Sequence, residues 1–370
     1  MQNNVDYQAR IDKVLARVDA DVVAIVPGAN MLYFTGLHYH LSERPTIAFF
    51  SAEGVSFIVP ELEVTKLQTQ DAFEARAFSW SDTDGYTAAF QEAIAAMGLN
   101  ADKTLAVDGQ TMRVFEMLAL GDAGVQTGAI ADAGDDLLGI RSIKTTDEIE
   151  AMRKAVQLSE TALTETLKQV RAGMTEREIA AILTEQLGLA GSRGHAFSPL
   201  VLTGARSALP HGFTADYEVK EGDFLLFDFG GSWLNYPADI TRTFVMGTAS
   251  DEMNKIYQAV HDANQASREI SKPGVTCGAV DKAARDVIEA AGYGEYFTHR
   301  TGHGLGLSGH EAPQIAANVE TLLEPGMVYT IEPGIYVPGL GGVRIEDDVA
   351  VTDTGIDVLT TFPRELRSLS

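Results

Sequence analysis

Hydrophobic and polar positions along residues 1–135 alternate with two different periods, which predicts a mixture of helices and strands. Apolar residues recur at helical spacing in residues 7–18, 86–97 and 111–120. Compact apolar runs predict strands at residues 21–26, 46–50 and 55–59. The turn Ala52-Glu53-Gly54 joins the last two strands in a predicted hairpin. We therefore predict an α/β domain here, without any cluster of acids, bases or nucleophiles.

Capping signals mark the start of a second region. The segment 131–136, Ala-Asp-Ala-Gly-Asp-Asp, breaks the pattern and predicts a domain boundary. A Thr-x-x-Glu capping box at Thr145 predicts a long helix to about residue 170, and a second box at Thr175 predicts a helix to about residue 187. We predict domains at residues 1–135 and 145–370, joined by a linker at 136–144.

The order of elements in the second region repeats. Two strand-like runs follow the first helix pair, then helices are predicted at 251–270 and 278–291, and two further strand-like runs come after them. This order predicts an α+β domain with two related halves, each a helix pair followed by a hairpin. We expect the candidate ligands from the two halves to meet between them.

Four carboxylates and one histidine of this second region form the main candidate site: Asp228, Asp239, His303, Glu332 and Glu346. Apolar, strand-like runs lead directly into three of the carboxylates. Burying a carboxylate is costly unless it is paired or binds a metal. Exposed polar positions on strand faces would explain one such residue but not the whole set, so we predict a shared cation site with ligands for two ions.

The donor types indicate which cations fit. An oxygen-rich set with one imidazole favours Mn²⁺, Co²⁺, Fe²⁺ or Zn²⁺ over a thiolate-type zinc site. Two ions roughly 3.5–4 Å apart can share a water, lower its pKa and stabilise the oxyanion of a tetrahedral intermediate. The candidate chemistry is therefore hydrolysis.

Composition limits the partners and the cellular location that we expect for the protein. The 370-residue chain is 45% hydrophobic, and its net charge of −24, from 28 basic and 52 acidic residues, argues against a nucleic-acid partner. No apolar run approaches the ~20 residues of a membrane span, and residues 1–6 do not resemble a signal peptide. The single cysteine, Cys277, fits a reducing compartment. We expect a cytoplasmic enzyme that binds neither nucleic acid nor membranes.

Five sequence motifs together resemble the pita-bread metallopeptidases, and most closely their proline-specific branch, prolidase and aminopeptidase P. The motifs are Asp228-Phe-Gly, Asp239-Ile-Thr-Arg-Thr, His303-Gly-Leu-Gly with His310-Glu, Ile331-Glu-Pro-Gly and Val343-Arg-Ile-Glu-Asp. The resemblance covers residues 145–370 in order and spacing. It implies a pita-bread (creatinase/aminopeptidase-type) catalytic domain, preceded by a smaller creatinase-like α/β domain.

Carried over by position, the resemblance implies roles for the five ligands. Asp239 and Glu346 would bridge two divalent metal ions, which we expect to be Mn²⁺, with Co²⁺ or Zn²⁺ as alternatives. Asp228 would complete the shell of one ion, and His303 and Glu332 would complete that of the other. Glu332 would also act as general base towards a metal-bridging hydroxide.

The same resemblance implies residues that contact the substrate. His310 and His211 would assist catalysis by hydrogen bonding to the substrate or intermediate. His299 and Tyr336 match positions that line a proline pocket, and Arg344 would orient a carboxylate. In some prolidases a loop like that of His38 and His40 reaches the neighbouring subunit's active site, and an ordinary polar loop is the alternative. We expect a homodimer.

Gln314 marks a departure from the family. Many prolidases carry an arginine four residues after the position of His310, where it can bind a dipeptide's carboxylate, whereas Gln314 offers no charge. We predict an Xaa-Pro peptidase, with aminopeptidase P activity or a proline-specific carboxypeptidase on longer peptides as alternatives. A non-peptide amidohydrolase and a non-catalytic peptide-binding module are weaker alternatives, since all five ligands are present.

Overall fold

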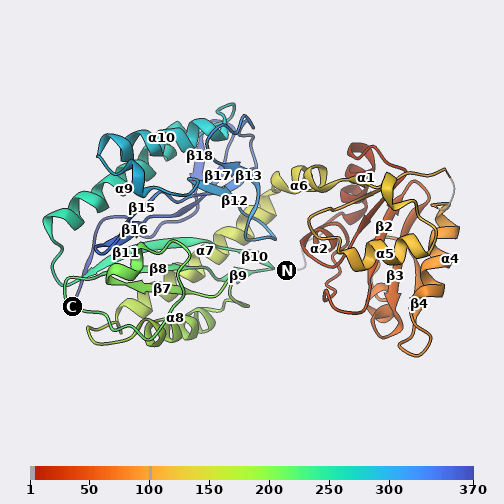
Figure 1. Ribbon diagram of the computed structural model, residues 1–370, viewed down its shortest axis with the longest axis horizontal. Helices are drawn as coiled ribbons and strands as arrows, with labels where there is room; N and C mark the ends of the chain where they lie inside the picture. Colours follow the sequence, from red (N-terminus) through yellow and green to blue (C-terminus); the bar gives the residue numbers. More distant parts are fainter. Residues whose placement is uncertain (1–4, 100–101) are drawn as a thin grey trace. The chain divides into compact units, whose positions relative to one another are not determined.

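The computed structural model describes residues 5–99 and 102–370, and it separates into two compact units, Met1–Arg141 and Ser142–Ser370 (Figure 1). The boundary lies inside the segment 136–144 that we assigned to a linker. Most of that segment is not an extended linker but belongs to helix α6 (Gly134–Ser142). The side chain of Leu137 is fully buried, and its apolar contacts favour an ordered helix here.

The N-terminal unit contains a six-stranded mixed sheet in the order β4-β3-β2-β1-β5-β6. Its strands are β1 (Val22–Ile25), β2 (Ile47–Ser51), β3 (Gly54–Pro60), β4 (Ala75–Trp80), β5 (Leu105–Val107) and β6 (Ala131–Asp132). The predicted hairpin is confirmed, because β2 and β3 pair antiparallel. The other side of β3 pairs in parallel with β4, as does β1 with β5.

Helices bury this sheet. They are α1 (Tyr7–Arg17), α2 (Ala29–Thr35), α3 (Val64–Gln68), α4 (Thr87–Met97), α5 (Val114–Asp122) and α6. The apolar residues of α4 and α5 form one core with alternate residues of the central strands. Every residue of β1 and β2 is buried, as expected for central strands covered on both faces. The predicted α/β character of this domain is confirmed.

The C-terminal unit is built on two larger sheets. One has the order β19-β11-β8-β7, from β7 (Leu200–Thr203), β8 (Phe224–Phe229), β11 (Ile240–Met246) and β19 (Ser368–Leu369). The other has the order β13-β12-β14-β17-β18, from β12 (Gly302–Gly304), β13 (Glu311–Ile315), β14 (Val328–Ile331), β17 (Asp347–Val351) and β18 (Ile356–Val358). Two ribbons complete the unit, β9 (Ser232–Trp233) with β10 (Tyr236–Pro237) and β15 (Gly334–Val337) with β16 (Gly341–Arg344).

Two helix pairs enclose these strands from opposite sides (Figure 1). The first pair is α7 (Thr146–Leu167) and α8 (Glu176–Ala190), and the second is α9 (Asp251–Ile270) and α10 (Cys277–Ala290). Both predicted capping boxes are present, at Thr145 and Thr175. The predicted order of helix pair, hairpin, helix pair and hairpin is confirmed, although β7, β12 and β13 were not predicted.

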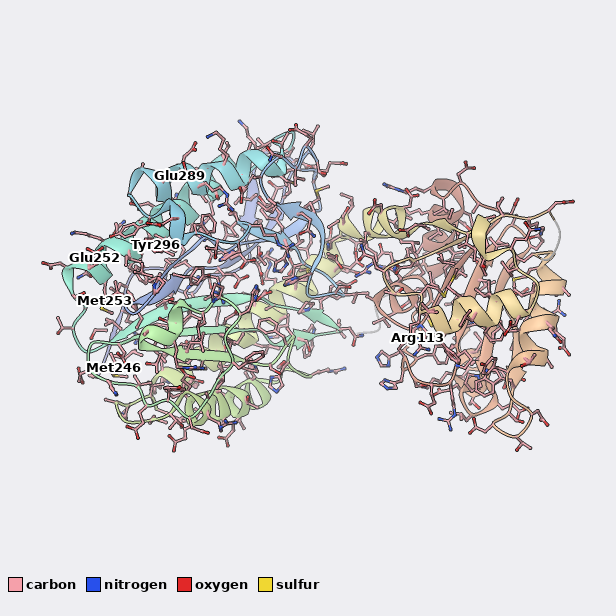
Figure 2. All side chains as sticks on the ribbon, viewed as in Figure 1. Arg113, Met246, Glu252, Met253, Glu289 and Tyr296 are labelled. Atoms are coloured by element: carbon pink, nitrogen blue, oxygen red, sulfur yellow. The ribbon has the colours of Figure 1, made fainter. Side chains whose placement is uncertain are left out.

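Helix α9 illustrates how the chain separates its acidic surface from its core. Glu252 is exposed and the adjacent Met253 is buried, and Glu289 is exposed on α10 (Figure 2). Such acids lie in water and need no compensating partner. The buried carboxylates described below are a different population, and only they require a chemical explanation.

Glycine is required in β12 by the closeness of its neighbours. A Cβ atom on Gly302 would lie 1.8 Å from the carbonyl oxygen of Thr330, whereas one on Gly309 would meet nothing within 4 Å. We predict that Gly302→Ala lowers the free energy of unfolding in urea by about 1–3 kcal/mol, as overpacking does. Gly309→Ala, the matched control, should change it by less than about 0.5 kcal/mol. Equal effects of the two substitutions would contradict the close packing of β12 on β14.

Candidate metal centre and active site

The β-ladder of the second hairpin is interrupted where two predicted ligands lie. β14 pairs with β17 and β15 pairs with β16, but neither ladder includes Glu332 or Glu346. Pro333 follows Glu332 and has no N–H group with which to continue the ladder. The two glutamates therefore lie at the same level of neighbouring chain segments, in a gap between two regular stretches of sheet.

The main-chain N–H groups at this gap find partners on other strands. The N–H of Glu332 donates to the carbonyl oxygen of Thr301 at 2.7 Å, and that of Glu346 donates to the carbonyl oxygen of Thr241 at 3.1 Å. Thr301 immediately precedes β12, and Thr241 belongs to β11. The interruption thus brings Glu332 close to β12, which carries His303, and Glu346 close to β11, which begins directly after Asp239.

The predicted ligands lie both within strands and at strand ends. Asp228 lies within β8 and His303 within β12. Asp239, Glu332 and Glu346 instead lie just outside their strands. A side chain in a regular strand is committed to one face of the sheet, whereas residues at strand ends and breaks can converge from several strands.

Three of the predicted ligands converge closely. Donor atoms of Asp239, His303 and Glu346 lie within 4.8 Å of one another, and all three residues are buried. The Nε2 atom of His303 is 3.7 Å from Oδ2 of Asp239 and 3.3 Å from Oε1 of Glu332. Asp228 lies outside the three-donor group, although its charge acts on the same carboxylates.

The hydrogen bonds of His303 determine its tautomer. Its Nδ1 atom lies 3.1 Å from the carbonyl oxygen of Gly304, which can only accept, so Nδ1 carries the proton. Burial, followed by the neighbouring His310, lowers the pKa of His303 to about 3. The imidazole is therefore neutral at ordinary pH, and the lone pair of Nε2 faces the carboxylates, as a metal ligand requires.

The carboxylates repel one another in a site shielded from water. Burial, followed by the charges of Glu346 and Asp228, raises the pKa of Asp239 well above its ordinary value. Burial, followed by Glu332 and Asp228, does the same to the pKa of Glu346. Burial raises the pKa of Glu332 to about 7. A divalent cation would relieve this repulsion, as would protons bound to the carboxylates.

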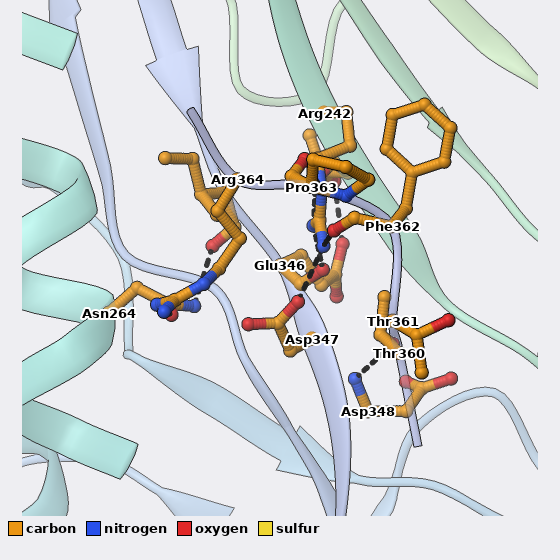
Figure 3. Close-up of polar contacts among 12 residues, drawn as sticks. Arg242, Asn264, Glu346, Asp347, Asp348, Thr360, Thr361, Phe362, Pro363 and Arg364 are labelled. Carbon is orange, nitrogen blue, oxygen red and sulfur yellow. Dashed lines mark hydrogen bonds and ion pairs between the residues drawn. The ribbon is translucent and has the colours of Figure 1, made fainter. Parts of the chain in front are cut away.

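A buried arginine forms hydrogen bonds with the chain segment that carries Glu346 (Figure 3). Arg242, which is 1% exposed, donates to the carbonyl oxygen of Glu346 at 2.6 Å and to Oδ1 of Asp347 at 2.7 Å. The next residue, Asp348, accepts the N–H of Asp239 at 3.1 Å. These bonds fix the main chain that carries Asp239 and Glu346, and so limit where their carboxylates can point.

The predicted pocket residues form one hydrogen-bond chain. Arg344 donates to the hydroxyl of Tyr336 at 2.8 Å, and that hydroxyl lies 2.7 Å from Nε2 of His299. His299 directs Nδ1 at the carbonyl oxygen of Arg300, 2.6 Å away, so Nδ1 carries the proton and Nε2 accepts from the tyrosine. Burial lowers the pKa of His299 to about 4. Arg344 is also ion-paired with Asp228.

His310 lies directly against the predicted metal ligand His303, with ring centroids 3.8 Å apart. Its Nδ1 atom is 3.1 Å from the guanidinium of Arg300, which can only donate, so the proton of neutral His310 is on Nε2. Burial, followed by Arg300 and His211, lowers its pKa. Gln314 accepts a hydrogen bond from the same guanidinium. His211 is exposed, and its charge acts on both His299 and His310.

His38 and His40 belong to the N-terminal unit, between α2 and β2. Both are exposed and alternate with the buried Leu37 and Tyr39. Their role at an active site stays a prediction.

Several residues that organise the site were not predicted. Asp281, fully buried on α10, accepts hydrogen bonds from the main-chain N–H and the hydroxyl of Thr301 at 2.9 and 2.8 Å, and it pairs with Arg285. A carboxylate on the buried face of an amphipathic helix is a signal that could have revealed it. Arg242 and Arg300 lie within quoted or adjoining motifs, but no pattern distinguishes them from surface arginines.

A buried group of carboxylates with one correctly oriented imidazole, framed by two helix pairs and their hairpins, defines the class of a metal-dependent hydrolase. The donor set fits divalent cations, because it is rich in hard oxygen ligands and its negative charges lie close together in the interior.

The chain belongs to metallopeptidase family M24, whose pattern it matches over residues 150–353, and residues 8–143 match the creatinase/prolidase N-terminal domain. It is 43% identical to an Xaa-Pro dipeptidase of Pyrococcus furiosus over 233 residues, 63% of this chain and 67% of that protein. It is also similar to a prolidase structure from Thermococcus sibiricus (33% identity, 99% of this chain and 100% of that one, TM-score 0.92). An X-Pro aminopeptidase structure from Thermotoga maritima matches with 33% identity, 97% and 100% coverage and a TM-score of 0.84.

These similarities confirm the predicted family, the two-part fold class and the enzyme class of a metallopeptidase related to Xaa-Pro peptidases. In residues 5–99 and 102–370, no helix is long and apolar enough to cross a membrane.

The raised pKa values predict how pH affects metal binding. Glu332, with an ordinary pKa of 4.5 and a folded-state pKa of about 7, retains a proton in the metal-free protein that the unfolded chain has lost. The stability of the metal-free protein should therefore fall as pH rises from about 5 to about 8, whereas bound cations replace the protons. We predict that Mn²⁺ raises the melting temperature more at pH 8 than at pH 5.

Comparing melting temperatures with and without Mn²⁺ at each pH isolates this effect from other titrating groups. Glu332→Gln removes one titrating carboxylate and should reduce the pH dependence of the Mn²⁺-induced shift. A shift of the same size at both pH values would mean that the carboxylates hold no protons in the metal-free protein.

Proposed function

We propose that this protein is a dinuclear-metal Xaa-Pro peptidase that hydrolyses the bond preceding proline in Xaa-Pro dipeptides. The observation that carries the proposal is the convergence of Asp239, His303 and Glu346 beside a neutral His310 and a connected His299–Tyr336 pair. The names of the similar proteins, an Xaa-Pro dipeptidase and a prolidase, support the substrate class.

Five residues would hold the metals: Asp228, Asp239, His303, Glu332 and Glu346, with Asp239 and Glu346 as bridges. We propose Mn²⁺ as the native ion, with Co²⁺ or Zn²⁺ as substitutes, because the donors are mostly hard carboxylate oxygens. When bound, two such cations activate a water molecule as nucleophile and stabilise the oxyanion of the tetrahedral intermediate.

Glu332 is suited to act as the general base. Its Oε1 atom lies 3.3 Å from Nε2 of the predicted ligand His303, so the carboxylate lies within the candidate metal centre. It would take a proton from the attacking water and pass it to the proline nitrogen as that nitrogen leaves. The hydroxyl of Thr330, 3.2 Å from Oε1, orients the carboxylate for this transfer.

His310 is suited to donate a hydrogen bond to the substrate. Because its Nδ1 atom accepts from Arg300, the N–H on Nε2 is available for a carbonyl oxygen or an oxyanion. His211 would act alongside it, which the influence of its charge on His310 supports. His299 and Tyr336 would line the proline ring.

Aminopeptidase activity on longer peptides is the second candidate, favoured by the similarity to an X-Pro aminopeptidase. We further propose a cytoplasmic location, consistent with a single buried thiol, and a homodimer in which His38 and His40 serve the neighbouring subunit. Their outward-facing side chains support that last role.

The metal requirement leads to a direct prediction for mutants. Asp239→Asn should lower kcat/KM for Ala-Pro at least about a hundredfold, the scale on which loss of one transition-state stabilising group is felt. Asp286→Asn, on the exposed face of α10, is the matched control and should stay near the wild-type rate. Near-normal turnover by Asp239→Asn would show that Asp239 is not part of the catalytic centre.

The same assay distinguishes the candidate functions. Exhaustive EDTA treatment should abolish cleavage of Ala-Pro, and Mn²⁺ should restore it. Mass analysis of products from Ala-Pro and Ala-Pro-Ala should show hydrolysis of the dipeptide and little of the tripeptide. Removal of alanine from the N-terminus of Ala-Pro-Ala at an equal rate would instead identify an aminopeptidase.

A further inference from the structure

One arginine at the site has no carboxylate partner. Arg300 lies between His299 and β12, and its guanidinium donates through Nη2 to Nδ1 of His310 at 3.1 Å and through Nη1 to Oε1 of Gln314. Its carbonyl oxygen accepts the N–H of His299. Among the residues that the structure describes, no acidic side chain forms an ion pair with Arg300. The hydrogen-bond partners of its guanidinium are the neutral side chains of His310 and Gln314.

Arg344, for which we predicted carboxylate binding, is already engaged. Its guanidinium donates to Thr241 at 3.0 Å, to Tyr336 at 2.8 Å and to Asp228, and the residue is only 4% exposed. Releasing it for a substrate would leave Asp228 and Tyr336 without this donor in a buried site, which is costly. Arg300 is only partly buried, and its two bonds use two of its five N–H donors.

Arg300 is also close to the reacting centre. Its guanidinium contacts Nδ1 of His310, and the ring of His310 lies 3.8 Å from that of His303. In an Xaa-Pro dipeptide the terminal carboxylate is attached to the proline Cα, and the same Cα is bonded to the nitrogen of the bond that is cleaved. A group that binds it must therefore lie beside the metal ligands.

We propose that Arg300 binds the terminal carboxylate of Xaa-Pro dipeptides, with Gln314 as its positioning residue. The Gln314 amide is itself oriented, since its Nε2 donates to the carbonyl oxygen of Glu311 at 3.2 Å while its Oε1 accepts from Arg300. An arginine fork and a carboxylate can form two parallel, charge-assisted hydrogen bonds. The inference rests on the proposed peptidase function and assigns its preference for a free carboxylate to this residue.

The test compares Ala-Pro with Ala-Pro amide, which lacks the negative charge, using the Mn²⁺-loaded enzyme. The wild type should favour Ala-Pro in kcat/KM by roughly 10- to 100-fold, the range of a hydrogen bond to a charged group. Arg300→Gln should bring this ratio close to one, mainly by raising KM for Ala-Pro. The double variant Arg300→Gln/Gln314→Arg moves a guanidinium to the neighbouring position and should restore part of the preference.

Arg177→Gln, on the exposed face of α8, is the matched control and should leave the ratio unchanged. An Arg300→Gln enzyme that loses activity equally on both substrates, with the ratio intact, would overturn carboxylate binding and leave Arg300 as a support for His310. A wild type that cleaves both substrates equally would also overturn it, while keeping the peptidase function. Failure of the wild type to cleave either substrate would count against the proposed function itself.

Discussion

Repulsion among buried carboxylates is the constraint around which the C-terminal unit is organised. Asp239, Glu332 and Glu346 lie in a space where burial and mutual charge raise each pKa, so the chain must provide either protons or cations there. The surrounding structure holds these groups together in spite of that cost. Arg242 secures the main chain of Glu346, and the ladder interruption at Pro333 directs Glu332 towards β12. Because divalent ions would remove the repulsion among these carboxylates, the site is suited to bind them tightly.

The neutral histidines follow from the same constraint. Each has its tautomer set by a partner that can only accept or only donate: a carbonyl oxygen for His303 and His299, and a guanidinium for His310. The lone pair of His303 is thereby turned towards the carboxylates of Asp239 and Glu332, and the N–H of His310 points away from Arg300. One histidine is oriented to bind a cation and the other to donate a hydrogen bond through Nε2–H, although their ring centroids are only 3.8 Å apart.

Much of this organisation could be predicted from local patterns. The capping boxes at Thr145 and Thr175 correctly located two helix starts, and apolar runs located β8 and β14, because propensity and burial act over a few residues. The placement of Glu332 and Glu346 at a strand interruption could not be predicted, since it depends on hydrogen bonds to Thr301 and Thr241 far along the chain. The different roles of Arg300 and Arg344 could not be predicted either, because they depend on contacts with residues distant in the sequence.

The central claim is that two divalent ions share Asp239 and Glu346. Anomalous X-ray diffraction from crystals of the Mn²⁺-loaded protein, collected on both sides of the manganese absorption edge, tests it most directly. We expect two anomalous peaks per chain, roughly 3.5–4 Å apart as in two-metal sites, each within ligand distance of both carboxylates. A single peak, or peaks that do not contact Asp239 and Glu346, would contradict the two-metal centre.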